Sequence, residues 1–311
     1  MADYTLTGLL ASIRRRASIP TTAVTGSDDA SLLAYINEEL QLHMSAQLVS
    51  VREEYYLRHS DTALSGTTYR IPTRAMGGSL RNVCLLDAGG KPIFQLSRLS
   101  QEKLPEYADK TQTVGYLVEG NNIRLYPSAS WGGASTLRMS YFERPNELVA
   151  TTTTTIRQIT QINTTTRVLT IAASHGFTTS TVCDLLKGTP GFESLSIDVV
   201  PTTTTSVSVT LASLPSGLAV GDYITLAQTS VIPQLPAEFH PVLAQRVAVR
   251  FLAAINDTVQ LEVATRELAK MEESIGILTT PRVEGGPRKI YQANGALSGA
   301  RFRVRGGIGV L

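Results

Sequence analysis

The chain has 311 residues, of which 42% are apolar and 17% are charged, and its net charge is +2. This length predicts two or three domains of roughly 100–150 residues rather than one small core. The near-neutral charge gives no whole-molecule argument for binding to nucleic acid or to an anionic membrane, and the low charge implies a surface covered largely by Thr, Ser, Asn and Gln.

No targeting or membrane segment is expected. The N-terminus lacks a charged-then-apolar signal pattern, and no apolar run reaches the length of about 18 residues that spans a bilayer. We therefore expect a cytosolic product that stays soluble or assembles there. The two cysteines, Cys84 and Cys183, belong to no CxxC or Cys/His cluster, so buried free thiols are expected rather than a disulfide or a zinc site.

Two helices are predicted near the N-terminus. A short helix over about 6–17 ends in three arginines, whose charge suits a helix C-terminus. A long helix begins near Asp28, with Ser27 or Asp28 as the N-cap, and runs to about Leu57. The segment His59-Ser60-Asp61 resembles a catalytic triad only in letters, because adjacent side chains cannot form that geometry, and it is interpreted as the helix end. The apolar residues of the long helix recur every three to four positions, at Leu32, Leu33, Ile36, Leu40, Met44, Leu48 and Val51.

The following segment predicts a compact β domain. Short stretches with alternating polarity are separated by turn residues such as Gly77-Gly78. Residues 116–126 are expected to form one hairpin, and residues 99–107 a helical turn at the edge of the domain. The expected strands cover residues 68–73, 80–86, 91–96, 114–119, 123–126 and 137–142.

Composition changes sharply at Thr151. Residues 151–230 hold 21 threonines but only seven Asp, Glu, Lys or Arg residues. Threonine, valine and isoleucine favour pleated surfaces because branching at Cβ restricts χ1. This pattern predicts a second, Thr-rich β module, a small barrel or sandwich. Its expected strands cover residues 156–162, 167–171, 196–200, 206–211 and 223–226.

Helices are predicted again from Pro236. A first helix carries an apolar stripe of Phe239, Leu243, Val247, Phe251 and Ile255. A second helix begins at a capping box formed by Asp257 and Gln260 and ends near Gly276. The residues expected to face inward on the second helix are Val259, Val263, Leu268, Met271 and Ile275.

Neither helical end of the chain forms a sound domain alone, because each has an apolar stripe that needs a partner. We therefore expect an α+β fold in which both termini build one discontinuous helical body, with β-rich domains inserted between its halves. The predicted parts are the first half of the helical body (1–64), the β domain (65–148), the Thr-rich β insertion (149–232), the second half of the body (233–280) and an extended C-terminal arm (281–311).

The C-terminal arm is basic and rich in glycine. It has six basic residues against one acid, Glu284, so its net charge is +5, and it has seven glycines. Such a segment becomes ordered only by lying on another surface. Docking on a partner subunit is favoured over binding to nucleic acid, because only Tyr291 and Phe302 supply aromatic rings. The candidate interaction residues are Arg282, Arg288, Lys289, Arg301, Arg303 and Arg305.

Motifs for chemistry are missing from the sequence. It contains no phosphate loop, no GxSxG, no HExxH and no acidic calcium loop. His43 is expected in a packing or surface role, and His240 in capping or an interface contact. Paired acids on helices are expected to be solvated or to bind a base four residues away, as in Glu54 with Arg58 and Glu262 with Arg266. We therefore predict no catalytic residue, no metal and no cofactor, and interpret the chain as a structural assembly subunit.

Three stretches of the chain resemble the head-to-tail adaptor (connector) proteins of tailed bacteriophages, chiefly those of short-tailed phages. They are LRMSYFERPNELV at 137–149, GLAVGDYITLA at 217–227 and IPQLPAEFHPVLAQRV at 232–247, followed by TPRVEG at 280–285. The order of a short helix, a linker and a long helix at the N-terminus also fits, so the resemblance covers nearly the whole chain.

The resemblance implies a ring, usually of twelve copies, beneath the portal protein at the head–tail interface of a virion assembled in the host cytoplasm. The ring would extend the DNA channel, through which DNA passes without sequence-specific binding, and would give the tail nozzle and fibre proteins a platform. The C-terminal arm would reach a neighbouring subunit or the portal. The alternative is a tail-fibre or carbohydrate-binding structural module of a virion; a nuclease or hydrolase would need an acidic or metal constellation that is missing.

Overall fold

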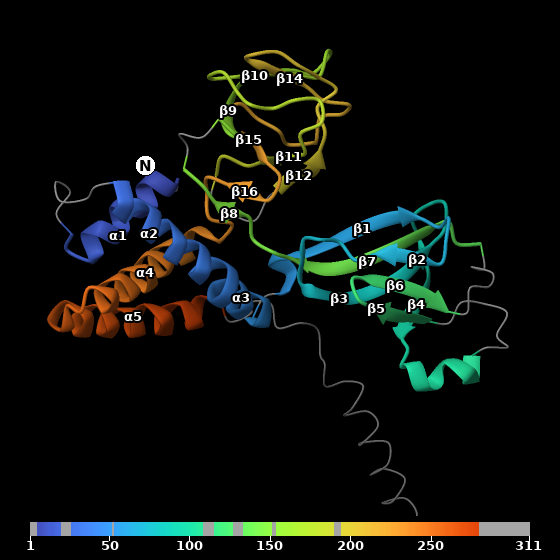
Figure 1. The fold of residues 1–311 in the computed structure, drawn as a ribbon, viewed down its shortest axis with the longest axis horizontal. Coiled ribbons are helices and arrows are strands. Elements are labelled where there is room, and N and C mark those ends of the chain that lie inside the picture. The colour runs from blue at the N-terminus through green and yellow to red at the C-terminus, as the bar shows by residue number, and fades with distance from the viewer. Residues whose placement is uncertain are drawn as a thin grey trace, which may run out of the picture. The chain divides into compact units, whose positions relative to one another are not determined.

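The structure is a computed structural model and describes residues 5–19, 26–51, 53–107, 115–126, 133–150, 154–189 and 194–279. The described residues up to Ile275 form one compact unit. The fold is α+β, with helices near both ends of the described chain and two curled β-sheets between them (Figure 1). No helix within these described residues is long and apolar enough to cross a membrane.

The N-terminal helices end earlier than the sequence predicts. Helix α1 covers Leu6–Arg16, and a second helical stretch consists of α2 (Gly26–Glu38), the π-helical segment η1 (Glu39–Met44) and α3 (Ser45–Val51). The expected caps Ser27 and Asp28 therefore lie inside the first turn of α2. The prediction of helix to Leu57 and of a helix end at His59–Asp61 is wrong, because a 3₁₀ turn, η2 (Glu53–Tyr55), leads directly into strand β1 (Leu57–Ala63).

The C-terminal helices begin with a 3₁₀ turn, η4 (Ala237–Phe239), followed by α4 (His240–Ala254) and α5 (Thr258–Thr279). The predicted capping box is confirmed in part, since the amide of Gln260 donates to Asp257 Oδ1 at 3.1 Å. Gly276 does not end α5, which continues to Thr279. The inward prediction is wrong for Val259 and Val263, which are 72% and 51% exposed.

One hydrophobic core joins helices from both ends of the described chain. Helix α4 supplies fully buried residues such as Leu243 and Val247, and it packs on α1 and α2. The apolar stripe predicted for α4 turns away from the core toward the end of the helix. Phe251 is only partly buried and Ile255 is exposed, and Leu252 faces the core instead. The buried residues that α1, α2, η1 and α3 contribute to this core are Leu6, Leu9, Ile13, Leu32, Ile36, Leu40, Met44 and Leu48.

The first sheet has the strand order β1-β7-β3-β4-β5-β6-β2. Its strands after β1 are β2 (Thr68–Arg70), β3 (Ala75–Leu86), β4 (Pro92–Arg98), β5 (Gly115–Glu119), β6 (Asn122–Tyr126) and β7 (Thr136–Glu143), with the 3₁₀ turn η3 (Gln101–Tyr107) after β4. These elements and the β5–β6 hairpin confirm the sequence predictions. Gly77 and Gly78 do not form a turn between strands: both have positive φ and lie in a bulge within β3.

The second sheet has the order β12-β11-β15-β9-β10-β14-β13. Its members are β9 (Ile156–Asn163), β10 (Val168–Ile171), β11 (Cys183–Leu186), β12 (Ser194–Val199), β13 (Thr203–Thr204), β14 (Ser208–Thr210) and β15 (Tyr223–Leu226). Each sheet encloses its own hydrophobic cluster, and this one centres on Ile159, Leu169, Leu185 and Ile224. Thus the expected barrel or sandwich is in each case a single curled sheet. Strands β1, β11 and β13 were not expected.

The chain runs into and out of the second sheet through one short parallel pair. Strand β8 (Glu147–Leu148) lies beside β16 (Thr229–Ser230), as Figure 1 shows. The side chain of Asn37 on α2 holds this pair to the helices, since its amide nitrogen donates to the Leu148 carbonyl at 3.0 Å and its oxygen accepts from the Leu148 amide at 2.8 Å.

Candidate functional site

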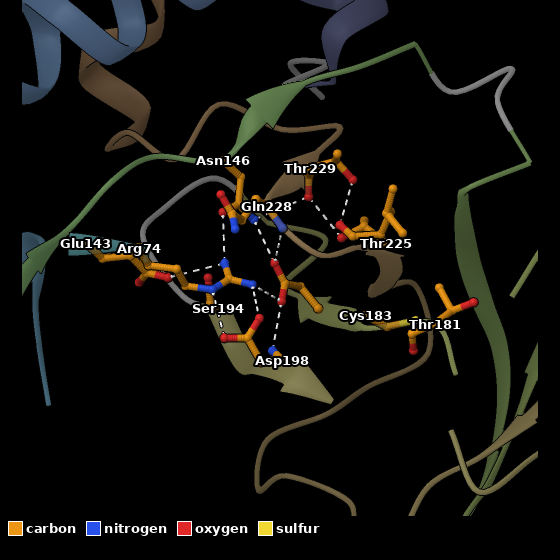
Figure 2. Close-up of polar contacts among 12 residues, drawn as sticks. Arg74, Glu143, Asn146, Thr181, Cys183, Ser194, Asp198, Thr225, Gln228 and Thr229 are labelled. Carbon is orange, nitrogen blue, oxygen red and sulfur yellow. Dashed lines mark hydrogen bonds and ion pairs between the residues drawn. The ribbon is translucent and has the colours of Figure 1, made fainter. Parts of the chain in front are cut away.

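The most constrained polar site is a buried cluster around Arg74, in the loop between β2 and β3. Arg74 is 3% exposed. Its Nη2 donates to Asp184 Oδ1 and to Asp198 Oδ1, both at 2.7 Å, and its Nε donates to Asp198 Oδ2 at 3.1 Å. Figure 2 shows the Arg74 guanidinium beside Asp198 on β12, and Asp184 lies on the neighbouring strand β11 of the second sheet. The cluster therefore joins the two β modules.

Asp184 is fully buried, yet both of its carboxylate oxygens are engaged. Oδ1 accepts from Arg74 and from the amide of Asp198 at 3.0 Å. Oδ2 accepts from the amide of Gln228 at 2.8 Å and from the side chain of Asn146 at 3.2 Å. The backbone φ of Asp198 is 54°, in the left-handed region that is strained for residues other than glycine. A buried charge is tolerated because its oxygens are paired and hydrogen-bonded in this way.

A second acid, Glu143 at the end of β7, lies on the other side of Arg74. Its Oε2 accepts from Arg58 Nε at 2.8 Å, and its Oε1 is 3.8 Å from Arg74 Nη1. The expected Glu54–Arg58 helix pair is replaced by this contact, because Arg58 lies on β1. The Glu143 amide donates to the carbonyl of Tyr56 at 2.7 Å, which ties this edge of the cluster to the end of the N-terminal helices.

Asn146 and Gln234 connect the cluster to the helical region. The amide of Asn146 donates to Gln234 Oε1 at 2.7 Å, and Gln234 Nε2 donates to Ser194 Oγ at 3.0 Å. The Tyr56 hydroxyl donates to the Gln234 carbonyl at 3.0 Å. Burial raises the pKa of Tyr56, so this hydroxyl keeps its proton. Two short segments between modules are thereby fixed to both sheets and to the helices.

The charges of the cluster hold Arg74 in its ionised form. Burial alone would lower the pKa of Arg74, but the hydrogen bonds and negative charges of Asp198 and Asp184 outweigh this effect and raise it. Every one of these polar groups is directed at another part of the same chain. The arrangement can lock modules together; it does not present a nucleophile beside a free base.

The helices are joined by further long-range polar contacts. Arg16 Nη1 on α1 donates to Gln245 Oε1 on α4 at 2.8 Å, and Gln245 Nε2 donates to the carbonyl of Ala264 on α5 at 2.9 Å. Arg250 on α4 binds Glu38 at 2.7 Å and Glu39 at 3.0 Å. Because Gln245 is fully buried, its amide acts as a specific connector among three helices.

The sequence-predicted interaction residues, Arg282, Arg288, Lys289, Arg301, Arg303 and Arg305, all lie outside the described residues. The predicted Glu262–Arg266 pair is present at 2.8 Å. His43 is exposed and His240 is buried, while His59 lies on β1 with its Nδ1 2.9 Å from Ser140 Oγ. Cys84 and Cys183 are free and buried, as expected.

No group of three or more His, Cys, Asp or Glu residues is positioned to hold a metal ion in the part of the chain that the structure describes. The Arg74 cluster itself escaped sequence analysis, since its members are up to 124 residues apart. The one available signal was the Glu143-Arg-Pro-Asn146 turn, which leaves the first sheet and carries two members of the cluster.

The fold and the cluster together define a structural protein of several modules, in which buried polar residues serve to join parts of the chain. The family model of the SU10 adaptor protein matches residues 4–175, more than half of the chain. The protein therefore belongs to the SU10 adaptor protein family and is a structural adaptor of a phage virion. No curated protein matches the chain.

Proposed function

We propose that the protein is a head-to-tail adaptor of a short-tailed phage, without catalytic activity, and that it assembles as a ring, of twelve copies by family likeness, beneath the portal protein. The ring extends the DNA channel and carries the tail nozzle and fibre proteins. Membership of the adaptor family supports this role. We propose the division of the chain expected from the sequence, with a helical body (1–64 and 233–280), two β modules (65–148 and 149–232) and the arm (281–311), except that β1 (Leu57–Ala63) belongs to the first sheet.

The observation that carries the proposal is the shared core of α1, α2 and α4. A core built from both ends of the described chain makes the helices one block, and the polar cluster fixes both β modules to it. A subunit of this kind holds its attachment surfaces at set positions, which a ring wall requires. In the proposal the helices form the wall, and the β modules contact tail proteins.

The connection between α4 and α5 supplies a surface for lateral contact. Ile255, Val259 and Val263 are 53%, 72% and 51% exposed, and they follow one another at intervals of four residues. Val259 and Val263 share one face of α5, four residues apart, and exposed apolar faces of this kind are used in contacts between proteins. In a ring they would be covered by the neighbouring subunit.

Mass photometry and negative-stain microscopy of the purified chain, with and without portal protein, test this function. We expect rings, or monomers that assemble only on portals. Deleting residues 281–311 should leave a folded monomer that joins neighbours or portal poorly, and a matched chain with the six basic residues changed to Gln separates charge from length. Unimpaired co-assembly of the truncated chain would refute the role of the arm.

One observation favours the alternative of a tail-fibre or carbohydrate-binding module. A groove of about 690 Å³ on β9 and β10 is lined by hydroxyl and amide side chains without a charge, together with Ile162, Val168 and Val220. The polar lining consists of Thr160, Gln161, Asn163, Thr164, Thr166 and Thr170. A stable trimer that binds a glycan array would favour this function over the adaptor ring.

A further inference from the structure

The two edges of the first sheet face a common cleft. The strand order places β1 at one edge and β2 at the other. Both nevertheless line one cleft of about 290 Å³, β1 through Ser60 and Thr62 and β2 through Arg70 and the residues that follow it. The sheet therefore curls until its edges approach each other, and it leaves a seam between β1 and β2 instead of closing as a barrel.

The backbone N–H and C=O groups on the seam side of β1 and β2 point away from the paired strand and into the seam. On β1, the Tyr56 carbonyl and the Leu64 amide bond to β7, so the alternation of an antiparallel ladder turns the backbone groups of the odd-numbered residues 57–63 away from it. On β2, the Thr67 carbonyl and the Ile71 amide bond to the β6 side, which turns Thr68 and Arg70 outward. Among the described residues these outward groups have no backbone partner.

The inner face of the seam is only partly covered. Ser60 lies opposite Met139 in the β1–β7 register, so Ser60 and Thr62 point toward the same side as the buried core residues. Ile71, Met139 and Tyr141 line the cleft beside them. These three apolar side chains are each only 2% exposed, whereas Ser60 is half-buried and Thr62 is exposed. A strand that enters here would complete two rows of hydrogen bonds and would lay its inward residues over Ser60 and Thr62.

The C-terminal arm contains a segment with the required pattern. Arg301-Phe302-Arg303-Val304-Arg305 alternates basic and apolar residues with the period of a β-strand, and glycines at 299 and 306 bound it. In an extended segment, Phe302 and Val304 share one face and the three arginines share the other. This segment lies outside the described residues.

We propose that residues 301–305 of one copy enter the β1–β2 seam of an adjacent copy as an added strand, with Phe302 and Val304 inward and the arginines outward. This inference rests on the proposed ring. Twenty-one residues lie between Thr279, the end of α5, and Arg301, and an extended chain across them spans about 75 Å. A compact chain of 275 residues is only about 50 Å across, so the arm is long enough to leave its own subunit.

Disulfide trapping between two different chains tests the proposal. One chain carries Ala63→Cys on the outward side of β1; the second carries Arg301→Cys, Arg303→Cys or Arg305→Cys. The chains are mixed under ring-forming conditions with a mild oxidant. Cys84 and Cys183 stay in place because both are buried and burial raises the pKa of both thiols. Control chains carry Gly295→Cys in the arm or the exposed Lys91→Cys at the turn before β4.

We expect disulfide-linked heterodimers from at least one arginine position, at a yield at least tenfold above both controls. The double substitution Phe302→Ser and Val304→Ser should abolish the disulfide link. Changing to lysine the two arginines that are not replaced by cysteine should preserve the link. Intact rings that give no link above the controls would overturn the seam contact and leave the ring standing. A chain that carries both added cysteines distinguishes the two cases: a disulfide that forms only within this single chain would overturn the exchange between copies. If neither rings nor disulfides form, the ring is refuted as well.

Discussion

Arg74 and Asp184 form a buried ion pair, with 2.7 Å between Nη2 and Oδ1, across 110 residues of sequence. The arginine belongs to the first β module and the aspartate to the second, and neither is more than 3% exposed. Removing one partner of such a pair costs more than the pair itself contributes, because the other charge then stays buried without compensation. The junction between modules is therefore the most sensitive polar site that the structure describes.

Replacement of Arg74 tests this junction. Arg74→Met leaves Asp184 buried without its cation, while Glu143 keeps its ion pair with Arg58. The substitution should lower the free energy of unfolding by about 3–5 kcal/mol. Arg74→Lys keeps the charge but not the planar, bidentate geometry, so an intermediate loss is expected. Urea denaturation measures both. Asp198→Asn is the matched control: its side chain is 53% exposed, and it should cost no more than about 1 kcal/mol. An Arg74→Met variant as stable as this control would contradict the assignment.

Adjacent positions on α4 test which face of this helix enters the core. Leu252 is 1% exposed, whereas Phe251 is only partly buried. Leu252→Asp places a carboxylate in the shared core and should destabilise the chain by about 3–5 kcal/mol. Phe251→Asp should cost roughly 1–2 kcal/mol, in proportion to the smaller apolar area that it removes from the interior. Thermal and chemical denaturation compare the two, and the reverse order would show that the helix is rotated.

His240 makes stability depend on pH. Burial lowers its pKa, against smaller opposing effects of the Leu235 carbonyl and Glu238, and its Nε2 lies 3.2 Å from that carbonyl. Below the unfolded-state pKa of about 6.5 the unfolded chain binds a proton that the folded chain does not, so stability should fall as pH decreases from 6.5. His240→Gln keeps a donor for Leu235 but cannot titrate. Its Tm should fall less than that of the parent chain between about pH 6.5 and pH 5. Equal slopes for the two chains would rule out this role for His240.

The two cysteines should react slowly. Burial, with the nearby charge of Asp184, raises the pKa of Cys183 to about 12, and burial also raises the pKa of Cys84. Because the thiolate is the reactive form, labelling of Cys183 by a disulfide reagent at pH 8 should be on the order of 1000-fold slower in the folded chain than in urea. Peptide mapping after timed labelling measures each cysteine separately. Rapid modification of Cys183 in the folded chain would contradict its burial.

The alternating strands of the first sheet could be predicted because one side of each strand faces the core and the other faces solvent. Strand β11 could not: Cys183-Asp-Leu-Leu186 is buried at all four positions, and a strand covered on both faces has no alternation. Strand β1 is an edge strand whose residues are all at least partly exposed, so its sequence carries little apolar pattern. Its position directly after a helix also favoured the continuation of that helix.

The Arg74 cluster was beyond sequence reasoning for another reason. An isolated arginine in a loop and an aspartate in a Thr-rich strand look like ordinary surface residues, and only the fold brings them together. Asp198 illustrates this, since its contact with Arg74 forms only where the second sheet meets the first. The local sequence pattern identifies helices and strands, but polar pairs between distant residues form only when these elements assemble.

The parallel pair β8–β16 determines how the Thr-rich module could be replaced by a different one. The Thr-rich module, residues 149–228, begins after Leu148 and ends before Thr229, and these two residues lie on neighbouring strands. The whole module is therefore an insertion whose two ends meet at one place in the fold. The module packs Ala150 against the helical core, and its Asp184, Asp198 and Ser194 contact Arg74 and Gln234 outside the module. A replacement module without a carboxylate in the place of Asp184 would leave Arg74 without its fully buried partner. Because both ends of the module lie at one pair of strands, another module could take its place without redirecting the chain on either side, provided that it supplies an acid in the position of Asp184.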